Sequence, residues 1–340
     1  MSLAEQLKAA AERDKLRLHT PGHKGAVFGF DLTELSDGSF PADFVTVAER
    51  RAAEIYGARH AHYLSGGSSQ GVKASIFYSG VNAVVDINSH RSVFDGFKLS
   101  GKRCVTAGNS GDIRPLTVEQ IDKALTADIR AVVVTTPTYY GFCADVDGIA
   151  EYCKKRGLLF IADSAHGAHF GFSDRLPKNV APVADICNVS THKTLSALTQ
   201  SALLLDNLSD DNSAKLRESV AVMGSTSPSY LLYATIDGAV AQVADKQTAE
   251  AYERLFGAVE NIKTEFPFLN NDDFTRLVLD CTKLEVSPAQ LNNALAGRGV
   301  YSELVSDKYI VFILTAEDSP STVTSLGRAL HDGIREIKVK

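Results

Sequence analysis

The chain has 340 residues, of which 44% are hydrophobic and 22% charged, and this composition is typical of a globular protein with one large domain or a large and a small one. Its formal net charge is −6, and lysines and arginines are scattered among acids, which argues against nucleic acid as a partner. No apolar run is long enough to span a bilayer and the charged start has no signal-peptide core, so we expect a cytoplasmic protein without membrane contact. The five cysteines form no CxxC pair, which favours reduced thiols over disulfides or a thiolate zinc site.

The first two thirds of the chain alternate between helical and strand patterns. Helical spacing predicts helices over 4–15 and 48–56, with the Pro/Gly turn "HTPGHKG" at 19–25 between them. From residue 60 we expect a short strand, the small-residue loop "SGGSSQG" (65–71) and a helix. Apolar runs typical of buried strands follow at 81–87, 131–137, 158–163, 184–190 and 201–205. A helical segment that ends at Gly157 joins two of these runs, which predicts a parallel βαβ unit.

The last third has a different pattern. A long helix is predicted over 237–262, followed by a strand-like segment near 275–284 and a strand pair at 300–304 and 309–315. Two further helices should begin at Ser287-Pro288 and Ser319-Pro320, where a capping hydroxyl precedes a proline. We therefore predict a large domain over 1–236, a connecting helix over 237–262 and a small α+β domain over 263–340.

Polar residues that could carry chemistry follow the predicted parallel strands, where open α/β sheets bind their ligands. Asp163 ends one strand, Lys193 follows the next inside "STHKT", and the loop 65–71 joins a strand to a helix start that could hold a phosphate. A phosphate cradle, a carboxylate and a lysine are what pyridoxal 5′-phosphate (PLP) requires. Each part alone is more often a turn, an N-cap or a solvated side chain, and only their joint order favours PLP.

The quoted stretches resemble those of the Orn/Lys/Arg decarboxylases, which are fold-type I PLP enzymes. The matching stretches extend over almost the whole chain: "HTPGHKG" (19–25), "SGGSSQG" (65–71), "INSHRSVFDGFKLSG" (87–101), "TTPTYYG" (135–141), "ADSAHGAHFGF" (162–172), "STHKTLSALTQSALL" (190–204) and "STSPSYLLYATID" (225–237). The resemblance implies a mostly parallel central sheet with helices on both faces and a small C-terminal α+β domain. It also implies a short form of the family, without the wing domain of the long members.

Residue roles are carried over by the resemblance. It implies that Lys193 forms the Schiff base and that Asp163 pairs with the pyridine nitrogen, with His166 beside it. His90 would stack on the cofactor ring. The phosphate would be held by the helix start and nearby side chains: Gly67, Ser68, Ser69, Gln70, Ser190 and His192. Thr226 and Ser227 would reach the site of a second subunit in a homodimer whose site lies at the subunit interface.

The implied reaction is decarboxylation of an amino acid, most simply a basic one (lysine, ornithine or arginine), through a quinonoid intermediate, as in polyamine metabolism. Three features leave the alternatives open. Ser164 replaces a glutamate that the family usually has, and Val72 replaces an asparagine; the segment 36–46 also lacks the family's His-Pro middle. The shortened chain and these departures keep two other hypotheses: a different PLP reaction, of aminotransferase or aldolase type, and a non-catalytic relative that holds PLP.

Several other residues have competing interpretations. His60, His62, His166 and His169 could suggest a metal site, but their spacing fits no zinc motif, and we expect no metal. Tyr139, Tyr140 and Lys24 either line the site or stabilise loops. Glu303 is a candidate for reading the distal group of the substrate, which the sequence does not otherwise identify.

Overall fold

The computed structural model describes residues 2–13, 16–33 and 42–339. Contacts between residues divide it into two units. The first comprises Met1–Pro137, Ala144–Ala168 and Asn179–Ala244, and the second comprises Thr138–Cys143, His169–Lys178 and Asp245–Lys340. The expected division of the chain at residues 236 and 262 stays a prediction. No helix in the described part of the chain is both long and apolar enough to cross a membrane.

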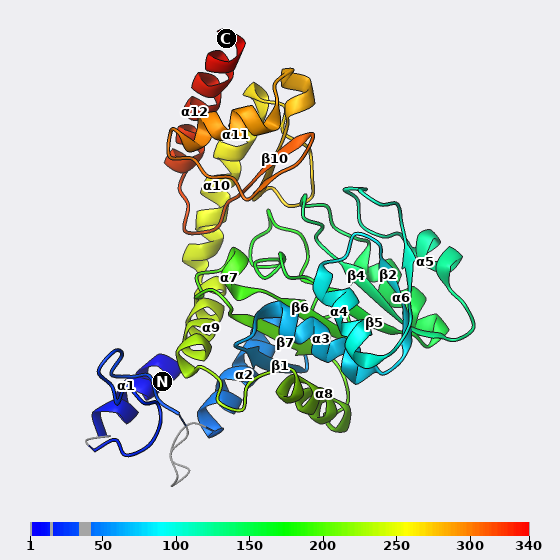
Figure 1. The fold of residues 1–340 in the computed structure, drawn as a ribbon, viewed down its shortest axis with the longest axis vertical. Helices are drawn as coiled ribbons and strands as arrows, with labels where there is room; N and C mark the ends of the chain where they lie inside the picture. Colours follow the sequence, from blue (N-terminus) through cyan, green and yellow to red (C-terminus); the bar gives the residue numbers. More distant parts are fainter. Residues whose placement is uncertain (1, 14–15, 34–41, 340) are drawn as a thin grey trace. The chain divides into compact units, whose positions relative to one another are not determined.

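The first unit is built on a seven-stranded sheet of order β1-β7-β6-β5-β4-β2-β3 (Figure 1). Its strands are β1 (His60–Leu64), β2 (Asn82–Asp86), β3 (Cys104–Ala107), β4 (Ile129–Thr135), β5 (Leu159–Asp163), β6 (Ile186–Val189) and β7 (Ala202–Asp206). The strands β2 to β6 are parallel, whereas β7 is antiparallel to both of its neighbours, β6 and β1. Six strands therefore run in one direction and place their carboxyl ends along the same edge of the sheet.

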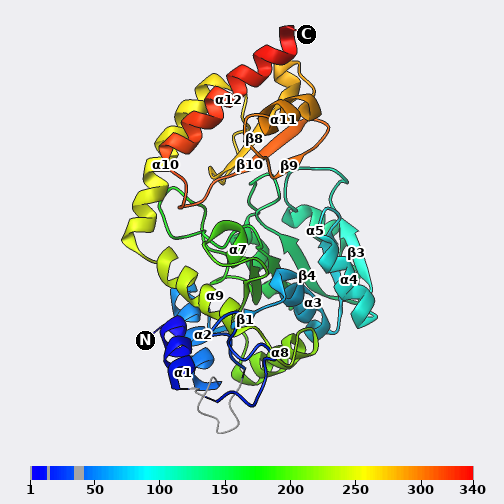
Figure 2. The same cartoon turned by 60° about the vertical axis from the view of Figure 1, so that its left-hand side comes forward.

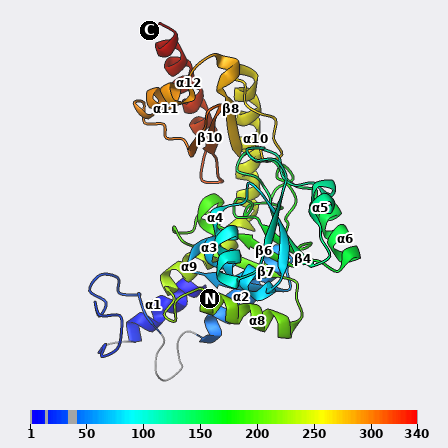
Figure 3. The same cartoon turned by 45° about the vertical axis from the view of Figure 1, so that its right-hand side comes forward.

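Helices surround this sheet: α1 (Leu3–Arg13), α2 (Ala42–Tyr56), α3 (Gly67–Ser79), α4 (Arg91–Ser100), α5 (Val118–Ala124), α6 (Val146–Arg156), α7 (Thr191–Thr194), α8 (Asp210–Val222) and α9 (Tyr230–Val243). One face of the sheet packs against α3, α4 and α8 through a core that includes Val72, Ile76 and Leu216. Strand residues of the opposite face, such as Val132 and Phe160, are also buried, as expected for a parallel sheet covered on both sides. Figure 3 shows α5 and α6 side by side, where Asp122 accepts hydrogen bonds from the two α6 side chains Tyr152 and Arg156.

The second unit contains a three-stranded antiparallel sheet of order β8-β10-β9 and three helices. Its elements are α10 (Lys246–Glu265), β8 (Arg276–Asp280), the 3₁₀ turn η1 (Cys281–Leu284), α11 (Pro288–Ala296), β9 (Leu304–Val305), β10 (Tyr309–Ile313) and α12 (Pro320–Val339). In Figure 2, α12 lies along α10, and their buried residues share one core with β8, β10 and α11. This unit matches the expected small α+β architecture.

Most of the predicted elements are confirmed. The strand predicted over 300–304 is wrong in extent, since β9 comprises only Leu304–Val305, and three further corrections follow. The helix predicted over 48–56 begins already at Ala42. The edge strand β3 was not predicted, because its sequence "CVTA" is short and only half-buried. The single helix over 237–262 is wrong: α9 ends at Val243, and α10 begins at Lys246 after Asp245, whose carboxylate caps it by accepting from the Gln247 N–H (2.9 Å).

Asp237 joins α1, α2, β1 and α9 in the interior of the first unit. Its carboxylate accepts hydrogen bonds from the Leu3 N–H (2.9 Å) and the Tyr63 hydroxyl (3.3 Å), and it pairs with Arg51. We expect Asp237→Ala to lower the free energy of unfolding by about 2 kcal/mol, because three donors lose their acceptor in a buried place. Thermal unfolding would measure this loss. In Asp95→Ala, which removes only exposed ion pairs, the change should stay below about 1 kcal/mol; equal changes in both variants would contradict the prediction.

Candidate functional site

Lys193 and His166 meet at the carboxyl edge of the sheet. Lys193 lies in the short helix α7, directly after β6 and Ser190, and His166 follows the neighbouring parallel strand β5. The Lys193 Nζ atom is 3.1 Å from Nε2 of His166. The sequence predicted both residues at strand ends, and the register of β5 and β6 explains why the two loops meet.

Asp163 is the last residue of β5 and is almost completely buried, with 3% of its surface exposed. Its carboxylate accepts a hydrogen bond from the Ala165 N–H (3.3 Å). Burial raises the pKa of Asp163, while its electrostatic interactions with Lys193 and His90 act in the opposite direction. A carboxylate in this position is costly unless a cationic group pairs with it. The structure thus brings Asp163, Lys193, His166 and His90 into one electrostatic neighbourhood.

His90 has a structural role that the sequence did not reveal. It is the N-cap of α4, where its Nδ1 accepts the Ser92 N–H (3.2 Å) and lies 2.8 Å from the Ser92 hydroxyl. Because Nδ1 serves as an acceptor, the proton of the neutral ring is on Nε2. The cap therefore fixes both the tautomer and the orientation of the imidazole.

The start of α3 forms an uncapped helix N-terminus beside β6. The N-cap residue Gly66 makes no side-chain cap, and the first turn contains no acid. Gly67 has a positive φ of 71° and donates its N–H to the Gln200 carbonyl (2.8 Å). The hydroxyl of Ser190 donates to that of Ser68 (3.0 Å), and Ser69 follows in the same turn. A first turn with free N–H groups and adjacent hydroxyls is a favourable place for a phosphate.

The other predicted phosphate ligands are placed less directly. The Gln70 side chain is engaged in structure: it accepts the Gly66 N–H (2.9 Å) and donates to the Val220 carbonyl (3.0 Å). His192 lies in α7, and its Nδ1 is 2.8 Å from the Ser201 carbonyl, an acceptor, so Nδ1 carries a proton. Thr226 and Ser227 lie in the exposed loop between α8 and α9, and no hydrogen bond joins them to Ser68 or Ser190 within the described part of the chain.

Buried polar groups that the sequence analysis did not assign occur in the segments that carry Asp163 and Lys193. The hydroxyls of Ser164, Thr191 and Thr194 are buried without a hydrogen-bond partner among the described residues. Asn188 lies inside β6 with a side-chain oxygen in the same condition. The signal for Asn188 was a polar residue within the apolar run "ADICNVS", which indicates a specific partner because burial of an unpaired amide is costly.

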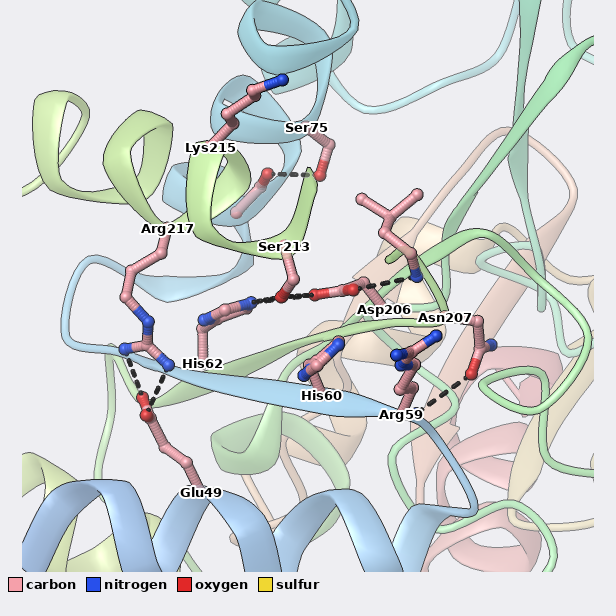
Figure 4. Close-up of polar contacts among 12 residues, drawn as sticks. Glu49, Arg59, His60, His62, Ser75, Asp206, Asn207, Ser213, Lys215 and Arg217 are labelled. Carbon is pink, nitrogen blue, oxygen red and sulfur yellow. Dashed lines mark hydrogen bonds and ion pairs between the residues drawn. The ribbon is translucent and has the colours of Figure 1, made fainter. Parts of the chain in front are cut away.

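His60 and His62 belong to β1, as predicted, the edge strand that pairs with β7. Figure 4 shows His62 beside Asp206 and Ser213, with Nε2 of His62 2.9 Å from the Asp206 carboxylate. Ser213 also donates to Asp206 (2.9 Å). Burial acts to raise the pKa of the Asp206 carboxyl, but the interactions with His62 and Ser213 outweigh it and lower that pKa. His60, His62 and Ser213 line a cavity of about 880 Å³ between α2, β1 and α8. Within the described ranges, no group of three His, Cys, Asp or Glu residues could hold a metal ion.

The remaining candidates belong to the second unit or to the N-terminal segment. The Tyr139 hydroxyl donates to the Glu303 carboxylate. Burial is the larger cause that raises the pKa of Tyr139, and this hydrogen bond raises it further. His169 is fully buried, with Nε2 3.1 Å from the Thr275 hydroxyl. Lys24 donates to the His19 carbonyl and holds its own loop. The expectation for the segment 36–46 falls largely on residues outside those that the structure describes.

The residues present fit PLP. Asp163 offers a buried carboxylate without a cationic hydrogen-bond partner among the described residues, which is what a protonated pyridine nitrogen requires. Ser68, Ser69 and the N-terminus of α3 offer an anion site, and the unpaired hydroxyls near Lys193 offer further donors. The start of α3 follows β1, and His90 follows β2. Asp163 ends β5, and Lys193 follows β6.

Comparisons with known proteins agree with this arrangement. The sequence model of the family "Orn/Lys/Arg decarboxylase, major domain" matches residues 26–285. An arginine decarboxylase of Bacillus cereus is 26% identical over 368 residues, covering 95% of this chain and 80% of that protein. A lysine decarboxylase of Francisella novicida has a TM-score of 0.78 at 19% identity, over 97% of this chain and 59% of its own.

This chain thus spans about three fifths of that lysine decarboxylase. A structure of SPT with PLP has a TM-score of 0.74 at 17% identity, over 98% of this chain and 85% of that one. These likenesses confirm the expected fold-type I α/β class with its mostly parallel sheet. The family model covers well over half of the chain. The chain therefore belongs to the Orn/Lys/Arg decarboxylase family.

Proposed function

We propose that this protein is a PLP-dependent decarboxylase of a basic amino acid: lysine, ornithine or arginine. One observation carries the proposal: the Lys193 amine is 3.1 Å from His166, in the electrostatic neighbourhood of the buried carboxyl of Asp163. When bound, PLP supplies an aldehyde that condenses with amines and a ring that takes up electrons from the substrate Cα. The matching family and the arginine decarboxylase relative support this reaction over other PLP chemistry.

Different residues of the chain would bind different parts of PLP. Asp163 would hold the positive charge on the pyridine nitrogen, and the fixed ring of His90 would pack against the cofactor. Ser68, Ser69, Ser190 and the N–H groups at the start of α3 would bind the phosphate. His192 can add a donor only when its Nε2 is also protonated, since Nδ1 already donates to Ser201.

Proton transfer at the substrate Cα falls to Lys193. Its amine can hold a proton and deliver it to Cα after CO₂ leaves, with His166 as the neighbour that orients Nζ. The broken bond must be the one to the carboxylate, and that choice depends on how the substrate is oriented in the site.

The proposal extends to assembly and compartment. A homodimer in which Thr226 and Ser227 contribute to the second subunit's site would give that exposed loop a function. The five unpaired cysteines suit a reducing cytoplasm. A role in polyamine metabolism would follow from a diamine or agmatine-like product.

A substrate screen tests the reaction. The purified protein is loaded with PLP and incubated separately with L-lysine, L-ornithine, L-arginine and L-leucine, and both CO₂ and the amine product are measured. We expect release from at least one basic amino acid and none from leucine. Formation of a keto acid or an aldehyde without CO₂ would instead support the alternative PLP reactions, and no turnover with bound PLP would support a non-catalytic relative.

The phosphate site can be tested separately. We expect Ser190→Ala and Ser68→Ala each to weaken PLP binding about tenfold, because each removes a hydroxyl from the phosphate site and from the Ser190–Ser68 hydrogen bond. The double variant should lose less than the product of the two, since the residues share that bond. Absorbance titration with PLP measures the affinities. Ser209→Ala, at the start of α8 without a cap bond, is the matched control, and an equal loss there would contradict the assignment.

A further inference from the structure

Asn188 connects the lysine-bearing strand to the helix that begins at the phosphate site. It lies in β6, completely buried, two residues before Ser190. Its backbone carbonyl accepts the Ser164 N–H (2.8 Å), directly after Asp163, and its side-chain amide donates to the Ser75 hydroxyl of α3 (3.3 Å). Ser75 in turn donates to the Gly71 carbonyl one turn earlier (2.8 Å), the bond drawn at Ser75 in Figure 4.

The direction of these bonds orients the Asn188 amide. Because the Ser75 proton is used on the Gly71 carbonyl, the Ser75 oxygen must accept, so Asn188 presents its NH₂ group to Ser75 and its oxygen to Gly71. That oxygen has no hydrogen-bond partner among the described residues. This oxygen instead lies against the backbone of α3 at Gly71.

Gly71 is required for this close approach. A Cβ built at Gly71 would lie 2.1 Å from the Asn188 side-chain oxygen and 2.7 Å from Cδ1 of Leu64. Helix α3 therefore packs on β6 with its backbone directly against Asn188, and the amide sets their separation. Since an α-helix is stiff over a few residues, this contact one turn inside α3 also fixes Ser68 and Ser69 in its first turn.

We propose that Asn188 is a positioning residue for the phosphate end of PLP. It holds the N-terminus of α3 at the distance from β6 at which the Ser68 and Ser190 hydroxyls meet. This inference rests on the proposed function, because it requires PLP to bind at α3. It predicts that loss of Asn188 weakens contacts to the phosphate and leaves contacts to the pyridine ring unchanged.

Comparison of PLP with pyridoxal, which lacks the phosphate, isolates this role. In Asn188→Ala we expect PLP affinity, measured by absorbance titration, to fall about tenfold, while pyridoxal affinity stays within about twofold of wild type. Ser75→Ala should act in the same direction with a smaller effect. Ser79→Ala is the matched control, because Ser79 also donates to a carbonyl of α3, that of Ile76 (2.8 Å), but makes no bond to Asn188.

A compensating pair makes the test independent of general destabilisation. Gly71→Ala alone should weaken PLP binding by more than tenfold, because its methyl group collides with the Asn188 oxygen. Adding Asn188→Ala removes the closer of the two clashes and leaves only that with the end of the Leu64 side chain, so the double variant should bind PLP more tightly than Gly71→Ala alone. A double variant no better than the single one, or parallel losses of PLP and pyridoxal affinity, would overturn the proposal.

The outcomes separate the two proposals. If the wild-type protein binds no PLP, the proposed function fails and this inference fails with it. If the wild type binds PLP and Asn188→Ala binds it as tightly, only the positioning role is overturned.

Discussion

Replacing Lys193 with alanine should abolish decarboxylation, with a loss of turnover on the order of 10⁴-fold or more, because the variant lacks both the amine that joins the cofactor and the proton carrier at Cα. PLP could still occupy the site through its phosphate and Asp163. We therefore expect Lys193→Ala to retain weak, reversible PLP binding. Borohydride treatment followed by mass spectrometry of the intact protein should find PLP attached to the wild type and none attached to the variant.

His166→Gln is the informative companion to this variant. It keeps Lys193 but changes the group 3.1 Å from its amine, so we expect PLP attachment to persist while turnover falls by a smaller factor, on the order of tenfold. If Lys193→Ala turned over basic amino acids at the wild-type rate, the lysine would have no catalytic role and the proposed function would fail.

The sequence predicted the strand ends that hold Asp163 and Lys193 because both follow apolar runs typical of strands buried on two faces. It could not predict which strands are neighbours. The position of β1 beyond the reversed strand β7 brings the start of α3 next to Ser190, and the pairing of β1 with β7 joins residues over a hundred positions apart. The proposed phosphate site was inferred from a loop motif, whereas the arrangement of its residues depends on that long-range topology.

The functions of His90, Gln70 and Asn188 show a second limit. The motif "NSHRS" placed His90 in the site, but its role as N-cap of α4 depends on the helix beginning at the next residue. Gln70 belongs to the expected phosphate loop, yet its amide joins the loop to Val220, far along the chain. A polar residue inside a strand pattern such as Asn188 signals a partner, and only the packing of α3 on β6 identifies it.

Asp163→Asn should separate the function of this residue from its contribution to stability. Without a charge on residue 163 to balance a protonated pyridine nitrogen, turnover should fall on the order of 1000-fold. The stability of the cofactor-free protein should instead increase. Burial raises the pKa of Asp163 above its ordinary value of 3.8, so the folded state binds that proton more tightly than the unfolded state. Its contribution to stability is therefore greatest below pH 4 and is lost as the pH rises from about 4 through the folded pKa.

Asparagine avoids the cost of burying a carboxylate and can keep the hydrogen bond from the Ala165 N–H. Cofactor-free Asp163→Asn should therefore melt at a higher temperature than cofactor-free wild type at pH 7. The difference should shrink as the pH falls below about 4, where the wild-type carboxyl becomes protonated in the unfolded state as well as in the folded state. With PLP present the order should reverse, because the wild type gains more from binding. Melting curves at several pH values, with and without PLP, measure all three effects. A variant that is less stable than wild type without PLP, and equally active with it, would show that Asp163 is a structural residue and not the partner of the cofactor.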